Sequence, residues 1–317
     1  MVGLFKGLRL GDTSSKYVTW WVRSLDGGLG MEKEWKRSMS EPLATGKAYR
    51  FDQSFVAASS IAQQYYCEAK VEQSYVHGDI PSEAKEAGTS LHEEVLAMEK
   101  VELKDLVERI EKAPLLTASF GVHGRILDVD VAGMPDAVVF EKSVPRWVIE
   151  LKTTKGDPTR LWDDQLVQVR VYGLLLEKMG FDCSKMWLAL VRWRQEDVRG
   201  PRKEEMLSRI TRSLMRGETK ELEARFGMRF FLFRHDAGEA ERAVAWAQGY
   251  WLGRRGAVPS SSPGKCKICE YSAICPYSLV KFSLDSAAER RALPRNTWGT
   301  GPDSSSRTSG SSSPVRK

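Results

Sequence analysis

The spacing of hydrophobic residues changes from a helical to a strand-like period after residue 112. Residues 52–70 and 90–112 predict helices, and apolar side chains of the second lie close to one helical stripe: Leu91, Val95, Met98 and Leu106. Residues 124–131 then alternate apolar and polar side chains, and 136–140 and 147–151 are short runs rich in strand-forming residues. We therefore expect two helices followed by three consecutive strands.

The second half of the chain alternates between the two periods. Asp157 followed by Pro158 is a helix-start signal, and the helix it predicts ends at Gly180. After it we expect, in order, a strand, a helix, a strand and a helix at residues 186–193, 204–226, 228–234 and 236–255. This order predicts an α/β domain in which helices flank one central mixed sheet.

The two ends of the chain differ from this middle part. Residues 1–50 carry Trp20, Trp21 and Trp35 among Gly, Ser and Lys, which predicts an irregular extension packed by its tryptophans. Residues 283–317 are rich in serine and poor in aliphatic side chains, so they predict a disordered tail. The main domain is expected to span residues 51–282.

Composition narrows the class of protein. The chain has 317 residues, is 42% hydrophobic and 28% charged, and carries a net charge of +6. These values exclude a collagen, a wholly disordered chain and a small disulfide scaffold. No apolar stretch approaches the ~20 residues that span a bilayer, and no secretory signal pattern is present, so we expect an intracellular protein, cytoplasmic if prokaryotic. The mildly basic balance permits a polyanionic partner without requiring one.

The most informative polar residues lie at the ends of two of the predicted strands. Asp136 opens one strand, and Glu150 and Lys152 end the next; residues two apart on a strand share a face. If the strands pair, Asp136 approaches Glu150, and carboxylate oxygens are the ligands that Mg²⁺ or Mn²⁺ prefers. A metal there would polarise a phosphoryl oxygen, with the lysine stabilising developing charge. The alternative is an ordinary solvated acid–lysine pair.

Two further features accompany these acids. Gln168 and Tyr172 are four residues apart on one face of the next predicted helix, with Gln165 as the alternative partner. His92 lies on the helix that precedes the strands. Each also has a plain structural interpretation: a core-capping tyrosine, a solvated glutamine and a surface histidine.

Four of the five cysteines form a second pattern. Cys266, Cys269 and Cys275 fall within ten residues, and Cys67 lies about 200 residues upstream. Thiolates bind soft metals strongly, and four of them suit either a [4Fe–4S] cluster or structural Zn²⁺. Cys183 stands alone and is interpreted as a free thiol.

The loop at the end of the fourth predicted strand, taken as residues 191–203, is a candidate DNA-binding segment. Its arginines contact phosphates and its tryptophan can stack on a base of single-stranded DNA. The alternative is a solvated charged loop. The candidate residues are Arg192, Trp193, Arg194, Arg199, Arg202 and Lys203.

Taken in order, these motifs resemble a known nuclease group. Pro135-Asp136 followed by Glu150-Leu151-Lys152 resembles the PD-(D/E)xK motif. The ordered set from the helical histidine to the Cys-x₂-Cys-x₅-Cys cluster resembles the RecB-like iron–sulfur nucleases of the CRISPR-associated exonuclease and exonuclease V type. The resemblance covers roughly residues 55–280 and implies a restriction-endonuclease-like core.

The resemblance also implies roles for individual residues. Cys67, Cys266, Cys269 and Cys275 would ligate a [4Fe–4S] cluster. His92, Asp136, Glu150 and the carbonyl of Leu151 would bind Mg²⁺ or Mn²⁺, Lys152 would be the catalytic lysine, and Gln168 and Tyr172 would position the DNA strand or order the site.

The function implied is a single-stranded DNA exonuclease of 5′→3′ polarity in CRISPR adaptation or DNA repair, with other proteins of those pathways as candidate partners. The alternatives are a structure-specific endonuclease on the same fold, a non-catalytic DNA-binding subunit and a zinc-stabilised interaction protein.

Overall fold

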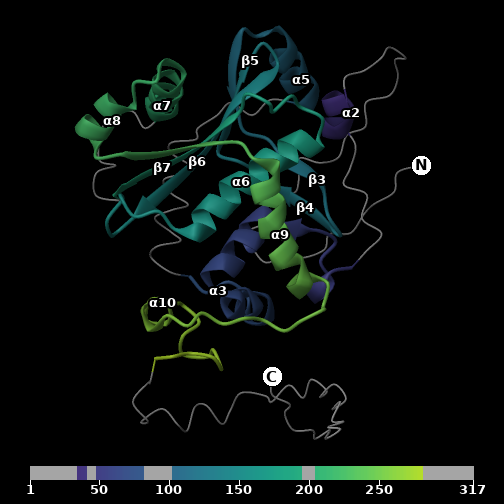
Figure 1. The fold of residues 1–317 in the computed structure, drawn as a ribbon, viewed down its shortest axis with the longest axis vertical. Coiled ribbons are helices and arrows are strands. Elements are labelled where there is room, and N and C mark those ends of the chain that lie inside the picture. Colours follow the sequence, from purple (N-terminus) through teal and green to yellow (C-terminus); the bar gives the residue numbers. More distant parts are fainter. Residues whose placement is uncertain (1–33, 41–47, 82–101, 195–203, 281–317) are drawn as a thin grey trace, which may run out of the picture. The chain divides into compact units, whose positions relative to one another are not determined.

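The main sheet is mixed and has five strands, in the order β2-β5-β6-β7-β8 (Figure 1). The computed structural model describes residues 34–40, 48–81, 102–194 and 204–280. The β6–β7 pair is parallel, and the other pairs are antiparallel. The strands are β2 Leu115–Ala118, β5 Ala137–Glu141, β6 Val144–Thr154, β7 Trp187–Arg194 and β8 Arg229–Arg234.

A second sheet of three strands has the order β1-β4-β3. Its strands are β1 Val56–Ala57, β3 Val122–Ile126 and β4 Val129–Gly133. The single strand expected at 124–131 is therefore wrong: the chain turns at Leu127, whose φ is +54°, and forms a β3–β4 hairpin. The expected central mixed sheet is present, but it does not include β4, which pairs in parallel with the distant β1 in the second sheet.

Helices cover both faces of the main sheet, as expected for an α/β domain. On one face, Val138, Val148 and Leu188 pack in a large core with α6 Asp163–Lys178, α9 Ala237–Trp251 and α3 Ala58–His77. On the other face, Ala137, Ile149 and Ala189 pack in a smaller core with α7 Glu204–Arg216 and α8 Thr219–Phe226. Alternate residues of β5, β6 and β7 thus face different cores.

Three helix predictions differ from the structure. Asp157 does not cap α6, which begins six residues later; its carboxylate accepts hydrogen bonds from the Thr159 backbone and hydroxyl in a turn. The helix expected at 204–226 is two helices, because Gly217 adopts a φ of +71° between them. The helix expected at 90–112 is interrupted, because Glu102 has an extended backbone directly before α5 Leu103–Lys112; residues 90–101 lie outside the described residues.

Short elements complete the described part. They are α2 Glu34–Ser40, the 3₁₀ turn η1 Arg50–Asp52 and α10 Pro263–Lys267. Trp35 of α2 is buried and its ring stacks on Phe181. Trp20, Trp21 and the predicted tail lie outside the described residues. None of the described helices is long and apolar enough to cross a membrane.

Candidate active site and cysteine pocket

Two carboxylates and a lysine meet on the α6 face of the main sheet. Ala137 pairs with Ile149, so one step further along the antiparallel register places Asp136 opposite Glu150. The Leu151 backbone N–H donates to Asp136 Oδ2 at 2.6 Å, which ties the two strands together at this point. Lys152 Nζ lies 2.6 Å from Glu150 Oε1. Asp136 and Glu150 are buried, whereas the Lys152 side chain keeps 24% of its surface exposed.

The charges of this cluster determine its protonation. Burial lowers the pKa of Lys152, but the carboxylates of Glu150 and Asp136 outweigh burial and raise it above the usual value, so the amine is an ammonium at neutral pH. A third acid, Asp164 in the first turn of α6, lies in the same field: burial raises its pKa, and Lys152 acts in the opposite direction. The sequence pattern did not single out Asp164, because an acid in the first turn of a helix is common.

Gln168 and Tyr172 of α6 lie against this cluster. Gln168 Nε2 donates to the Tyr172 hydroxyl at 2.9 Å, and the alternative partner Gln165 makes no such bond. Burial raises the pKa of Tyr172 well above its usual value, the charge of Glu150 adds to this, and the phenol stays neutral. A Cβ on Gly133 would lie 2.6 Å from Tyr172 Cε1, so a glycine is needed where the tyrosine ring meets β4. Tyr172 thereby supports the short connection that carries Asp136.

The donor types at this site fit a hard divalent cation, but the described residues do not complete its coordination. In the part of the chain that the structure describes, no three His, Cys, Asp or Glu side chains are arranged to hold a metal ion. The predicted ligand His92 lies outside the described residues. His123 contacts the Ser38 carbonyl and His235 contacts Glu177, so neither serves this site.

The predicted DNA-binding loop begins later than expected. Arg192, Trp193 and Arg194 belong to β7, and Arg199, Arg202 and Lys203 lie outside the described residues. Trp193 is 2% exposed and packs in the core beneath α7. The prediction that Trp193 stacks on a DNA base is wrong, because its ring is occupied by core packing.

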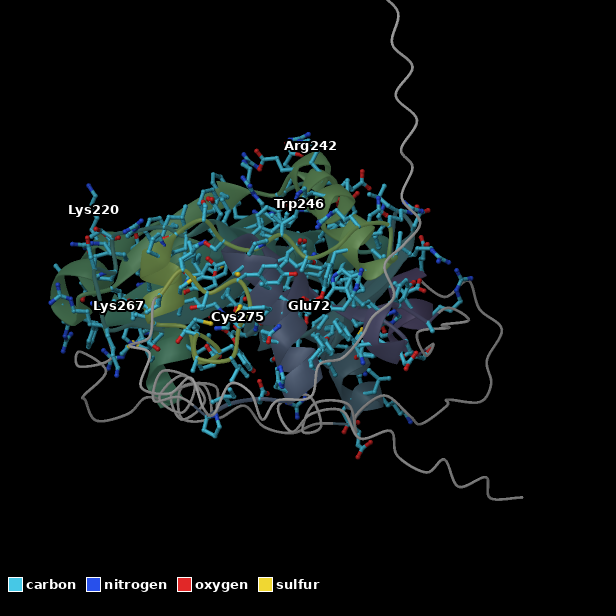
Figure 2. The ribbon with its side chains drawn as sticks, turned by 90° about the horizontal axis from the view of Figure 1, so that it is seen from below. Glu72, Lys220, Arg242, Trp246, Lys267 and Cys275 are labelled. Atoms are coloured by element: carbon cyan, nitrogen blue, oxygen red, sulfur yellow. The ribbon has the colours of Figure 1, made fainter. Side chains whose placement is uncertain are left out.

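The four cysteines Cys67, Cys266, Cys269 and Cys275 line one pocket, although about 200 residues separate the first from the others. The helix α3 is interrupted at Cys67, whose backbone is extended (φ −173°, ψ 115°), and the Ser260 N–H points to its sulfur at 3.3 Å. Figure 2 labels Cys275 and Lys267 on the segment after α9 that carries the other three. The pocket brings together four thiols, but among the described residues no three of them are arranged to hold a metal ion.

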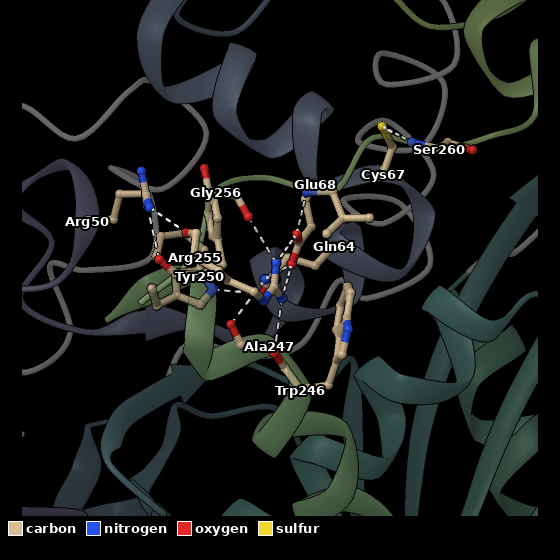
Figure 3. A network of polar contacts seen from close by, with 12 residues as sticks. Arg50, Gln64, Cys67, Glu68, Trp246, Ala247, Tyr250, Arg255, Gly256 and Ser260 are labelled. Atoms are coloured by element: carbon tan, nitrogen blue, oxygen red, sulfur yellow. Dashed lines mark hydrogen bonds and ion pairs between the residues drawn. The ribbon is translucent and has the colours of Figure 1, made fainter. Parts of the chain in front are cut away.

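A buried ion pair next to Cys67 fastens this segment to α3. The carboxylate of Glu68 is fully buried and is held by the Arg255 guanidinium, one bond of which measures 2.7 Å. It also accepts from Gln64 Nε2 and from the Val258 N–H, both at 2.7 Å (Figure 3). Arg50 reaches the same segment through the Arg255 carbonyl. We call Glu68, Arg255, Gln64 and Val258 the Glu68 clamp.

Burial affects the thiols to different degrees. It raises the pKa of Cys269 and of Cys275, and it raises that of Cys183 to about 12. Cys183 lies outside the pocket and is buried. Its position keeps it apart from the four thiols that line the pocket.

Comparison with known proteins identifies a family. The model of the PD-(D/E)XK nuclease superfamily matches residues 50–276. No curated protein sequence matches this chain. Among solved structures, the protein SSO0001 is 13% identical with a TM-score of 0.40, covering 78% of this chain and 95% of that one. An alkaline exonuclease from Laribacter hongkongensis is 14% identical with a TM-score of 0.34, covering 62% of this chain and 86% of that one.

Proposed function

This chain belongs to the PD-(D/E)XK nuclease superfamily, and we propose that it is a metal-dependent DNA exonuclease that hydrolyses phosphodiester bonds. The observation that carries this proposal is that the β5–β6 register brings Asp136, the residue before β5, next to Glu150 of β6, with Lys152 on the same face. The family match, over residues 50–276, includes β5 and β6 and all three of these residues.

In the proposed site, Asp136 and Glu150 hold Mg²⁺ or Mn²⁺, and His92 and the Leu151 carbonyl complete the ligand set by resemblance. The metal, when bound, polarises a phosphoryl oxygen and lowers the pKa of a coordinated water. The Lys152 ammonium stabilises negative charge that develops on the phosphate. Tyr172, held by Gln168, keeps the residues before Asp136 in place.

The substrate and pathway come from the resemblance. We propose single-stranded DNA as the preferred substrate, 5′→3′ polarity, and a role in CRISPR adaptation or DNA repair. A structure-specific endonuclease on the same fold would cut a circular DNA that carries a hairpin or branch, which an exonuclease cannot, because a circle has no free end. A non-catalytic DNA-binding subunit would bind linear and circular DNA and cut neither of them.

We further propose that Cys67, Cys266, Cys269 and Cys275 bind a [4Fe–4S] cluster that supports folding. The support is the shared pocket of four thiols whose sequence positions are far apart. Zn²⁺ is the alternative, because it uses the same ligands. Iron analysis and a visible spectrum of anaerobically purified protein separate them: the cluster absorbs near ~400 nm, whereas zinc is colourless.

The test of the nuclease proposal uses end-labelled linear DNA, single- and double-stranded, with Mg²⁺ or Mn²⁺. We expect Asp136→Asn and Glu150→Gln each to lower the cleavage rate more than about 100-fold, since each removes a charged metal ligand. Lys152→Ala is expected to be inactive but to retain metal affinity, because an ammonium is not a ligand.

Asp128→Asn is the matched control. Asp128 is an exposed acid paired with Arg254, away from the site. Wild-type protein that leaves linear and circular DNA intact with either metal, or a Glu150→Gln variant of full activity, contradicts the proposal.

A further inference from the structure

Arg192 lies one strand away from Lys152 on the candidate catalytic face. In the parallel β6–β7 pair, Lys152 is the register partner of Arg192, and register partners of neighbouring strands point to the same face. The next residue, Trp193, points to the opposite core. Arg192 is therefore a site-facing residue of the sheet rather than part of a surface loop.

Two of the three guanidinium nitrogens of Arg192 are buried without a hydrogen bond. The residue is 1% exposed, and neither Nε nor Nη1 has a hydrogen-bond partner among the described residues. Asp164 and Asp157 act on it as charges at a distance, and among the described residues no ion pair holds it. A guanidinium stays charged in proteins, and leaving its N–H groups unsatisfied in the interior is unfavourable. A native structure retains such an unsatisfied group when a function of the group outweighs its cost in folding stability.

We propose that Arg192 binds a phosphate of the nucleic-acid strand beside Lys152. This proposal rests on the nuclease function proposed above. Guanidinium N–H groups match phosphate oxygens in geometry and charge, and two of these groups are unused. Lys152 is engaged with Glu150 at the reacting centre, so Arg192 supplies a separate cationic contact one strand away.

The phosphate can approach from the side of Lys152, whose side chain is partly exposed. Arginine has several rotatable side-chain bonds, so a change of rotamer turns the guanidinium toward that opening. The role is binding and positioning of the strand, and no bond of the substrate is broken by Arg192.

The first test measures binding of a labelled single-stranded oligonucleotide by fluorescence anisotropy in EDTA, over a series of salt concentrations. We expect Arg192→Met to raise the Kd about tenfold or more. It also lowers the slope of log affinity against log salt by about 0.7, the value for one phosphate contact on single-stranded DNA. Arg192→Lys keeps the charge and restores most of the slope.

The matched control is Arg234→Met, which removes an exposed arginine at the opposite end of the same sheet, where it stacks on Trp187. It is expected to keep the wild-type slope. A similar loss in both variants means a general charge effect and overturns the proposal.

The second test separates binding from a structural role. Because Arg192 is unsatisfied, Arg192→Met is expected to keep or raise the melting temperature of the free protein. Added inorganic phosphate or oligonucleotide stabilises the wild type more than this variant. A lower melting temperature with an unchanged salt slope identifies a structural arginine and overturns the proposal. If the wild type binds DNA but never cleaves it, the nuclease proposal fails, while these binding measurements still decide the role of Arg192.

Discussion

The Glu68 clamp makes a sharp prediction about stability. Glu68→Ala removes a fully buried carboxylate that accepts from Arg255, Gln64 and the Val258 N–H. Breaking one side of a buried ion pair costs about 3–5 kcal/mol. The Arg255 side chain is 28% exposed and can turn partly to water, so the lower end applies, about 3 kcal/mol. At roughly 2–4 °C per kcal/mol, the melting temperature is expected to fall by about 6–12 °C.

The measurement is thermal or urea unfolding followed by circular dichroism, with alkylation of the thiols as a second readout. Val258 and Ser260 are both anchored next to Cys67, so loss of the clamp is expected to speed alkylation of Cys67 and Cys266. Glu241→Ala, which breaks an exposed pair with Lys178, is the control and is expected to change stability by less than about 1 kcal/mol.

A double-mutant cycle isolates the pair from its surroundings. Glu68→Met combined with Arg255→Met removes both charges, so it is expected to be less destabilising than the sum of the two single changes. Additive effects, or a Glu68→Ala variant that melts within about 2 °C of the wild type, would refute the reasoning that the clamp holds the C-terminal segment on α3.

Two further predictions concern single side chains. Gly133→Ala is expected to lower stability by about 1–3 kcal/mol and to reduce activity, because its Cβ meets the Tyr172 ring; Gly256→Ala, which meets nothing within 4 Å, is the control in the same unfolding and cleavage assays. If the four pocket thiols hold one cluster, Cys67→Ala loses iron and stability as the nearby cysteine variants do, whereas Cys183→Ala keeps both. Since its pKa is about 12 rather than 9.0, native Cys183 is expected to alkylate about a thousandfold more slowly than an unperturbed thiol at pH 8.5, which mass spectrometry can measure. Equal loss of iron in the Cys67→Ala and Cys183→Ala variants would contradict the proposed set of four ligands. Rapid labelling of Cys183 would contradict its assignment as a buried thiol outside that set.

The local spacing of hydrophobic and polar residues predicted the main strands, because each of these strands has one or two buried faces. Residues 147–149 are apolar between Arg146 and Glu150, and the structure places them in the central strand β6. The β3–β4 turn was missed because Leu127 takes a positive φ without glycine or asparagine to signal it. The second sheet was missed because pairing of Val56 with Val131 joins segments 75 residues apart, which local periodicity does not report.

The carboxylates and lysine of the candidate active site could be brought together from the sequence, whereas the polar contacts around Cys67 could not. Asp136, Glu150 and Lys152 were placed together by strand parity alone, and the register agrees with that placement. The kink at Cys67 and the Glu68–Arg255 pair could not be predicted in this way. They depend on contacts between α3 and a segment about 190 residues later, and each residue taken alone is an ordinary helix residue or surface charge.

Arg192 and Trp193 show what the alternation of side chains along a strand adds to the prediction. The sequence placed both at the start of a basic loop and assigned them one role. Assigning both residues to the end of the predicted strand 186–193 instead of to the loop, as β7 does, puts the two side chains on opposite faces. Trp193 then belongs to the core under α7, and Arg192 to the face of Glu150 and Lys152. A strand boundary thus decides which of two neighbouring residues can meet a substrate, and the element end is the part of a strand that propensity predicts least well.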